Sequence, residues 1–133
     1  MRKFLSIALL AAGVTVGAWA DEARVKISTP YDGSTVQTCN SINISFNQEV
    51  QADSSRFKVI SGAIPNAKSR AKELLDTEAG SVASKVLTHG AASDISIQTH
   101  DPLKPGTYCV VWRVVTDDGQ PTYNGMTFNV AER

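Results

Sequence analysis

The sequence predicts an all-β fold, an antiparallel β-sandwich or Greek-key barrel of about seven short strands in a single domain. Apolar residues recur at every second position over several short segments, and turn-forming residues separate these segments at regular intervals. Only one segment, from Asn66 to Glu78, shows the spacing of a helix. The chain has 133 residues, 42% hydrophobic and 20% charged, which suits one folded core and not two.

The segment from Tyr108 to Val115 has the strongest strand pattern. It is apolar at alternate positions and nearly apolar at the positions between, so we expect it to be the central strand, with Tyr108 and Trp112 in the core. Residues 42–46 alternate apolar with polar side chains, which is typical of a strand with one face in the core and one in water. Shorter strand-like runs occur at residues 24–28, 56–60, 81–88, 94–99 and 126–130.

The helix-like segment interrupts this pattern between two strands. Four apolar residues recur at helical spacing between Asn66, a candidate N-terminal cap, and Gly80, a stop signal. We therefore expect a short amphipathic helix or an ordered loop here. Its charged side chains suit a solvated face, and a docking surface is the alternative.

The first twenty residues resemble a secretory signal peptide. Arg2 and Lys3 precede an uncharged apolar run over residues 4–16, and Ala18 and Ala20 stand where a signal peptidase reads small residues. The run is too short to cross a bilayer, and no later segment is long or apolar enough. We predict cleavage after Ala20, export, and a mature domain over residues 21–133 with 11 basic against 13 acidic side chains.

Export bears on the two cysteines, Cys39 and Cys109. In an oxidising compartment, two thiols in a small domain most often form a disulfide, and this is the first prediction. The alternative is a pair of reduced thiolate ligands for copper(I).

Composition and motifs argue against several other functions. The balance of 13 basic and 13 acidic residues gives no electrostatic basis for binding nucleic acid. Two cysteines and two histidines cannot form a four-thiolate zinc site or a metalloprotease helix. The sequence lacks a Gly-x-Ser-x-Gly elbow and a glycine-rich phosphate loop, so we predict that the protein is not an enzyme.

Three segments of the sequence carry a recognisable pattern. The first is Ser28-Thr29-Pro30-Tyr31-Asp32-Gly33-Ser34, the second Phe46-Asn47-Gln48-Glu49-Val50, and the third the run from Leu103 to Pro121 with its Pro-Gly-Thr-Tyr, Trp-Arg-Val-Val and Asp-Gly motifs. In this order and spacing they resemble the CopC family of periplasmic copper-resistance proteins. The similarity covers nearly all of the mature chain except about residues 64–82. It implies a Greek-key barrel resembling an immunoglobulin sandwich, which agrees with the strand pattern.

The resemblance also implies a function and a metal site. Proteins of this family bind copper in the periplasm and pass it to a membrane copper transporter or another periplasmic copper protein. Their copper(II) ligands are an N-terminal histidine, a glutamate after the second strand, and the aspartate and histidine of an Asp-Gly-His turn. In this chain those positions hold Asp21, Gln48 with Glu49 beside it, Asp118 and Gln120. Both imidazoles are thus replaced, and the methionine-rich copper(I) loop has no counterpart.

The remaining histidines leave two hypotheses open. If residues 94–99 and 107–116 form a hairpin, His100 lies at one end, about 20 Å from the end that carries Asp118. His89 would lie at the Asp118 end, where it could join Glu49, Asp118 and the Asp21 amine in an altered copper(II) or zinc site. The alternatives are that His89 and His100 are solvated loop residues, and that the domain is a metal-free interaction or structural module working with a membrane partner.

Overall fold

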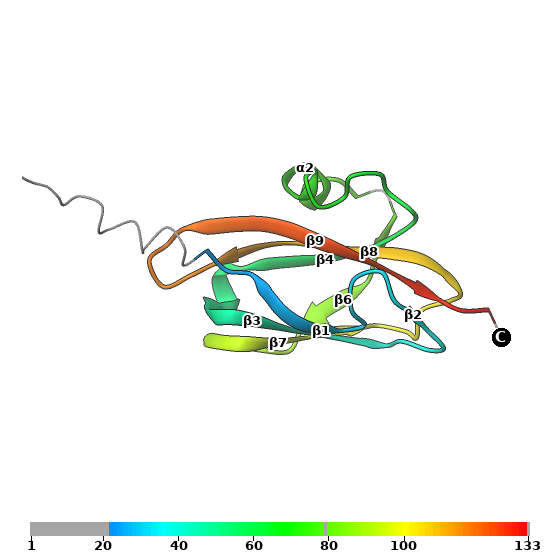
Figure 1. The fold of residues 1–133 in the computed structure, drawn as a ribbon, viewed down its shortest axis with the longest axis horizontal. Helices are drawn as coiled ribbons and strands as arrows, with labels where there is room; N and C mark the ends of the chain where they lie inside the picture. The colour runs from blue at the N-terminus through cyan, green and yellow to red at the C-terminus, as the bar shows by residue number, and fades with distance from the viewer. Residues whose placement is uncertain (1–21, 79, 133) are drawn as a thin grey trace, which may run out of the picture.

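The computed structural model describes residues 22–78 and 80–132, which form two face-to-face β-sheets with one short helix outside them (Figure 1). The predicted signal peptide and Asp21 lie outside the described residues. The strands are β1 (Val25–Thr29), β2 (Thr35–Val36), β3 (Ser41–Gln51), β4 (Arg56–Ser61), β5 (Ser81–Val82), β6 (Ser84–Val86), β7 (Ala91–Thr99), β8 (Gly106–Val115) and β9 (Pro121–Val130). The helices are the 3-10 turn η3 (Ala52–Ser54) and the α-helix α2 (Ala71–Leu75).

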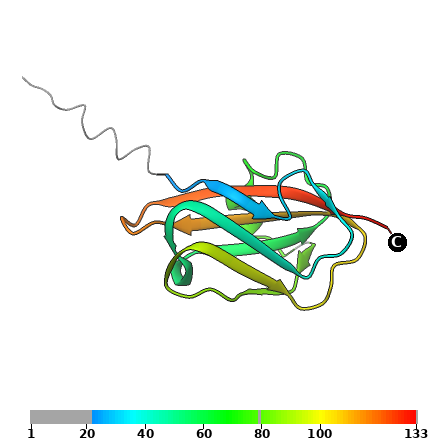
Figure 2. The ribbon, with the colours of Figure 1, turned by 60° about the horizontal axis from the view of Figure 1, so that its bottom comes forward.

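The two sheets confirm the predicted β-sandwich. One has the strand order β1-β3-β7-β6 and the other β2-β9-β8-β4-β5. All pairs are antiparallel except β2 with β9, where Thr35 and Val36 run parallel to the end of β9. The chain crosses repeatedly between the sheets, as the rotated view in Figure 2 shows.

One predicted pairing is wrong. The segments 94–99 and 107–116 do not form a hairpin, because β7 and β8 belong to different sheets. The connection between them crosses from one sheet to the other, and Leu103 in that connection is buried in the core and donates its N–H to the Cys39 carbonyl at 2.8 Å. The buried leucine in this connection is the sequence feature that indicates a crossing between sheets rather than an exposed hairpin turn.

The core lies between the sheets and is organised around β8, which is central as predicted. Trp112 is 1% exposed, and its ring packs edge-on against Phe46 with centroids 5.9 Å apart. Tyr108 is 5% exposed, stacks on Phe128 at 5.9 Å and donates its hydroxyl to the Lys104 carbonyl at 2.6 Å. Burial of such large aromatic side chains supplies much of the hydrophobic stabilisation of a small sandwich.

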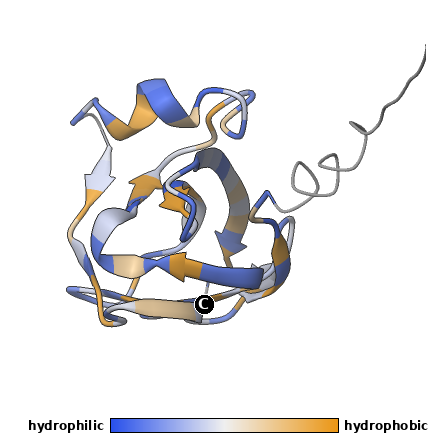
Figure 3. Ribbon diagram, turned by 90° about the vertical axis from the view of Figure 1, so that its left-hand side faces the viewer, coloured by the Kyte–Doolittle hydropathy of each residue, from blue (hydrophilic) through white to orange (hydrophobic). Residues whose placement is uncertain are grey.

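The insertion between β4 and β5 forms a second apolar layer on the outer face of the five-stranded sheet. Figure 3 views the molecule along its long axis and shows α2 outside this sheet. The buried residues of this layer are Ile60, Ala67, Ala71, Leu74, Leu75, Cys109 and Val111. The layer explains why β8 is apolar at the positions between its core residues, because both of its faces are covered.

The helix is shorter than predicted. It spans five residues, begins after Arg70, and has no side-chain cap. Asn66 is not its cap: this residue has a φ of 57° and opens the preceding turn, where its carbonyl accepts the N–H of Arg70 at 3.1 Å. The helix ends at Leu75, well before Gly80, which has a φ of 71° and lies beside β4.

Candidate functional site

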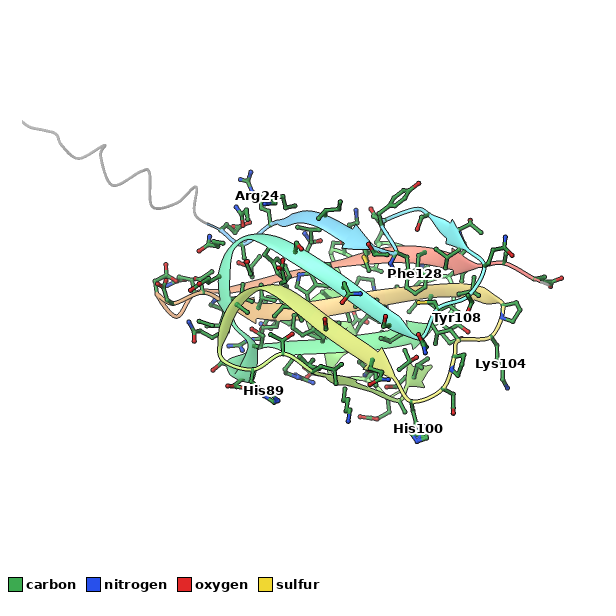
Figure 4. All side chains as sticks on the ribbon, turned by 90° about the horizontal axis from the view of Figure 1, so that it is seen from below. Arg24, His89, His100, Lys104, Tyr108 and Phe128 are labelled. Carbon is green, nitrogen blue, oxygen red and sulfur yellow. The ribbon has the colours of Figure 1, made fainter. Side chains whose placement is uncertain are left out.

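Three connections meet at the end of the sandwich where the metal was predicted. They are the η3 turn after β3, the β6–β7 connection with His89, and the β8–β9 turn with Asp118. Figure 4 shows His89 at this end and His100 at the other. The prediction that His89 and His100 do not share a metal therefore agrees with the fold, although the hairpin used to argue it is absent.

The β8–β9 turn is organised by the carboxylate of Asp118. Its Oδ1 atom accepts hydrogen bonds from the Thr116 hydroxyl and from the Gln120 N–H, the latter at 3.0 Å. These two donors hold the pKa of Asp118 below its ordinary value. The carboxylate is therefore charged at neutral pH, but its Oδ1 atom already accepts two hydrogen bonds within the turn.

The η3 turn is fastened to the end of β8 by Ser55. The Ser55 hydroxyl donates to the Gln51 carbonyl at 2.8 Å and accepts the N–H of Val115 at 3.0 Å. Arg113 adds a contact from its guanidinium to the Ser54 carbonyl at 3.3 Å. These bonds connect the end of one sheet to the end of the other, just before the Asp118 turn begins.

His89 lies beside Asp53 and not beside Asp118. Its Nδ1 atom is 3.2 Å from Asp53 Oδ1, and the other carboxylate oxygen accepts the Gly90 N–H at 3.0 Å. The hydrogen bond from His89 and that from Gly90 hold the pKa of Asp53 below its ordinary value. Sequence reasoning missed Asp53, because it lies 36 positions from His89 and no motif connects the two residues.

The other predicted ligand positions lie around this end without converging on it. Glu49 is exposed near the end of β3, and Gln48 beside it is half-buried. Asn47 fastens the start of the described chain to β3: its side-chain carbonyl accepts the Arg24 N–H at 2.8 Å, and its amide nitrogen donates to the Glu22 carbonyl. The chain preceding β1 therefore starts at this end of the sandwich, next to β3.

Within residues 22–78 and 80–132, no group of three or more His, Cys, Asp or Glu side chains is placed to hold a metal ion. The predicted set would also use Asp21, which lies outside this range, so it stays a prediction. The side chain of His100 is exposed, and its Nδ1 atom lies 3.5 Å from the exposed carboxylate of Asp101.

The predicted disulfide is not formed. Cys39 and Cys109 are both buried free thiols. Cys39 belongs to the core between the sheets, and Cys109 belongs to the outer layer beneath α2. Side chains alternate along a strand, so Cys109 must point away from the core that Tyr108 and Val110 enter. The same separation rules out a copper(I) site made by the two thiolates together.

Comparison with known proteins gives the family. A family model described as the CopC domain matches residues 25–131. The chain belongs to the CopC family. It is 30% identical over 126 residues to copper resistance protein C of Pseudomonas syringae pv. tomato, covering 93% of each chain. It is 23% identical over 125 residues to the protein of the same name from Xanthomonas campestris pv. juglandis, covering 94% of this chain and 92% of that one.

Solved structures agree with this assignment. PcoC of Escherichia coli, a methionine-rich copper resistance protein, is 26% identical with a TM-score of 0.64, covering 81% of this chain and 97% of that one. CopC of Methylosinus trichosporium OB3b, 13% identical with a TM-score of 0.65, covers 84% of this chain and 96% of that one and shares the fold. In the part of this CopC-family chain that the structure describes, no helix has the length and apolar character needed to span a bilayer.

Proposed function

We propose that this CopC-family protein binds copper(II) in the periplasm and passes it to a membrane or periplasmic partner, without catalysing a reaction. The family match over residues 25–131 carries the proposal, together with relatives named copper resistance proteins. The metal would lie at the end of the sandwich that carries the Asp118 turn, close to where the described chain begins.

The donors at this end suit copper(II) less well than a pair of imidazoles would. The carboxylates of Asp118 and Glu49, the side chain of Gln48, and the amine and carboxylate of Asp21 are mostly oxygen donors, whereas copper(II) prefers nitrogen. His89 supplies the imidazole. Its Nδ1 atom faces Asp53, an arrangement that in metal proteins fixes the ring and leaves Nε2 for the ion.

Copper(II) titration of the mature protein, residues 21–133, tests the proposal. Electron paramagnetic resonance should show a single bound copper(II) species at micromolar metal, with coupling to an imidazole nitrogen that His89→Ala removes. His100→Ala is the matched control, because His100 is equally exposed but lies at the opposite end. Acetylation of the N-terminal amine should weaken binding. If the titration shows no binding, or if both alanine variants have the same effect, the site is wrong.

The second candidate is a metal-free CopC-like interaction module. Two observations favour it: Gln120 stands where the resemblance implies an imidazole, and the described residues contain no preassembled group of ligands. Copper that stays bound through purification and gel filtration would remove this candidate.

A further inference from the structure

The strongest unassigned feature is a groove between the two sheets, on the side where β1 and β9 are the outer strands. Its volume is about 510 Å³. The apolar side chains of Trp112 and Met126 form part of its lining, and the Ser28 hydroxyl lies 3.4 Å from the sulfur of Met126. Ile27 and Tyr31 are 63% and 66% exposed, so two large apolar side chains lie together in solvent at the margin of the same groove.

The backbone beside this groove is an open sheet edge. Strand β9 pairs with β8 along its whole length, but on its other side β2 covers only Asn129 and Val130. Thr127 is covered as well, since its N–H reaches Asp32 and its carbonyl accepts the Gly33 N–H. Backbone groups that point the same way recur at every second residue, so those of Gly125 and Tyr123 also face outward. The Gly125 N–H is bonded to the Asn124 side chain at 2.8 Å, whereas the backbone groups of Tyr123 face no partner strand in the described chain.

The groove concentrates positive charge. Three cationic side chains line it, Arg24, Lys26 and Lys68, and Asp32 is the one acidic residue among the described lining. Lys68 and Asp32 form an ion pair at 2.6 Å, so they neutralise each other. Arg24 and Lys26 form no salt bridge within the described chain. This leaves two uncompensated positive charges, Arg24 just before β1 and Lys26 on it, in a protein whose mature form is expected to be slightly acidic.

We propose that this groove is a docking site for an extended acidic segment of a partner protein, which adds a strand to the open half of β9. Main-chain hydrogen bonds to the edge would supply affinity, and alternate side chains would enter the apolar floor over Met126 and Trp112. Acidic side chains would pair with Arg24 and Lys26. The inference is independent of the proposed copper site, which lies among other residues, and it is tested without metal.

The competing explanation is edge protection. Charged residues and β-bulges commonly keep an open edge from pairing with another chain. Strand β1, the edge of the other sheet, lines the groove opposite β9 and has both features: Lys26 lies within an irregularity of the pairing of β1 with β3. Edge protection predicts that nothing pairs with β9, and that removing the cations promotes self-association.

The experiment uses the metal-free mature protein, labelled with ¹⁵N, and an acetylated seven-residue peptide that alternates aspartate with valine. Saturable shifts are expected for amides of residues 24–28 and 122–126, with slower hydrogen exchange at the Tyr123 amide. The same peptide with a central proline should bind at least tenfold more weakly, because proline removes a donor. A lysine–valine peptide should not bind.

Two variants separate docking from general charge effects. Arg24→Glu with Lys26→Glu should weaken peptide binding at least tenfold, while Lys85→Glu, an exposed lysine on β6 at the opposite edge of the same sheet, should change it less than twofold. The proposal is overturned if millimolar peptide causes no saturable shift in the groove. It is also overturned if Lys85→Glu weakens peptide binding as much as the double variant does. Self-association of the double variant with unchanged peptide binding would overturn it too.

Discussion

The two cysteines give a sharp test of the architecture, because each thiol lies on a different face of the five-stranded sheet. With separate thiols, Cys39→Ala should lower the free energy of unfolding by about 1 kcal/mol, the contribution of roughly one buried methylene-sized group. With a disulfide, the same substitution would also open a loop of about 71 residues, which the chain-entropy model values at roughly 4 kcal/mol. The losses predicted for Cys39→Ala with and without a disulfide therefore differ by about 3 kcal/mol or more, well beyond the error of urea unfolding.

A double-mutant cycle sharpens this difference. Separate thiols predict that the losses from Cys39→Ala and Cys109→Ala add to within about 0.5 kcal/mol in the double variant. A disulfide predicts that each single variant loses the full cross-link and that the double variant loses little more. Burial raises the pKa of both thiols, so both are protonated at neutral pH and should react with an alkylating agent only after unfolding. Two results together would refute the structure at these positions: a protein mass two hydrogens below that expected for two free thiols, and a free energy of unfolding that reductant lowers by about 4 kcal/mol.

Three further predictions concern hydrogen bonds that hold strand ends. Partial burial raises the pKa of Asp32, but hydrogen bonds from Lys68 and the Thr127 N–H outweigh it and lower the pKa overall. Asp32→Asn should therefore lower the free energy of unfolding by about 1 kcal/mol or less at neutral pH. In acid unfolding this difference should vanish as the pH falls below the carboxyl's ordinary pKa and through its lowered value, and a difference that stays constant with pH would contradict the prediction. Ser55→Ala should cost about 1–2 kcal/mol in urea unfolding because it leaves a half-buried N–H of β8 without its partner, and Ser55→Thr should lose less. Tyr108→Phe should cost about 1 kcal/mol by removing one hydrogen bond to a backbone carbonyl, and an unchanged midpoint would show that bond to be dispensable.

The strands were predictable because alternation of apolar residues reports directly on burial. The pattern over residues 108–115 identified β8 as central, and Trp112 and Tyr108 as core residues, before any contact was known. Two features carried too little sequence signal. The two residues of β2 are too few to show a period, and residues 81–88 read as one strand although β5 and β6 belong to different sheets. Sheet membership depends on long-range pairing, which a local period does not encode.

The site was less predictable than the fold. His89 and Asp118 lie at the same end of the sandwich, as expected, although the hairpin of residues 94–99 with 107–116 from which this was argued does not form. Their contacts were not, since side chains at connections select partners by three-dimensional proximity: His89 meets Asp53, and Asp118 binds its own turn. The sequence did contain evidence against the predicted disulfide between Cys39 and Cys109. Cys109 follows the core residue Tyr108 in a strand, so its side chain had to face away from the core.

Asp118 has a structural task that does not depend on metal, so its presence alone says little about copper. Its Oδ1 atom accepts two hydrogen bonds that shape the β8–β9 turn, and a chain without copper would retain it for that reason. Gln120 is the informative position, since it replaces the imidazole that the family resemblance implies. Its backbone N–H serves the turn while its side chain is exposed, so Gln120→His should leave the fold intact.

If the Asp118 end is where copper(II) binds, Gln120→His should raise the affinity at least tenfold, or about 1.4 kcal/mol, and add nitrogen coupling to the electron paramagnetic resonance spectrum. Gln37→His is the matched control, because Gln37 is also an exposed glutamine and follows β2, away from both histidines in the sequence. His89→Ala in the Gln120→His background then asks whether both imidazoles bind the same ion. A gain at position 37 equal to that at 120 would mean that any added imidazole captures copper, and that the Asp118 turn has no special part in holding it.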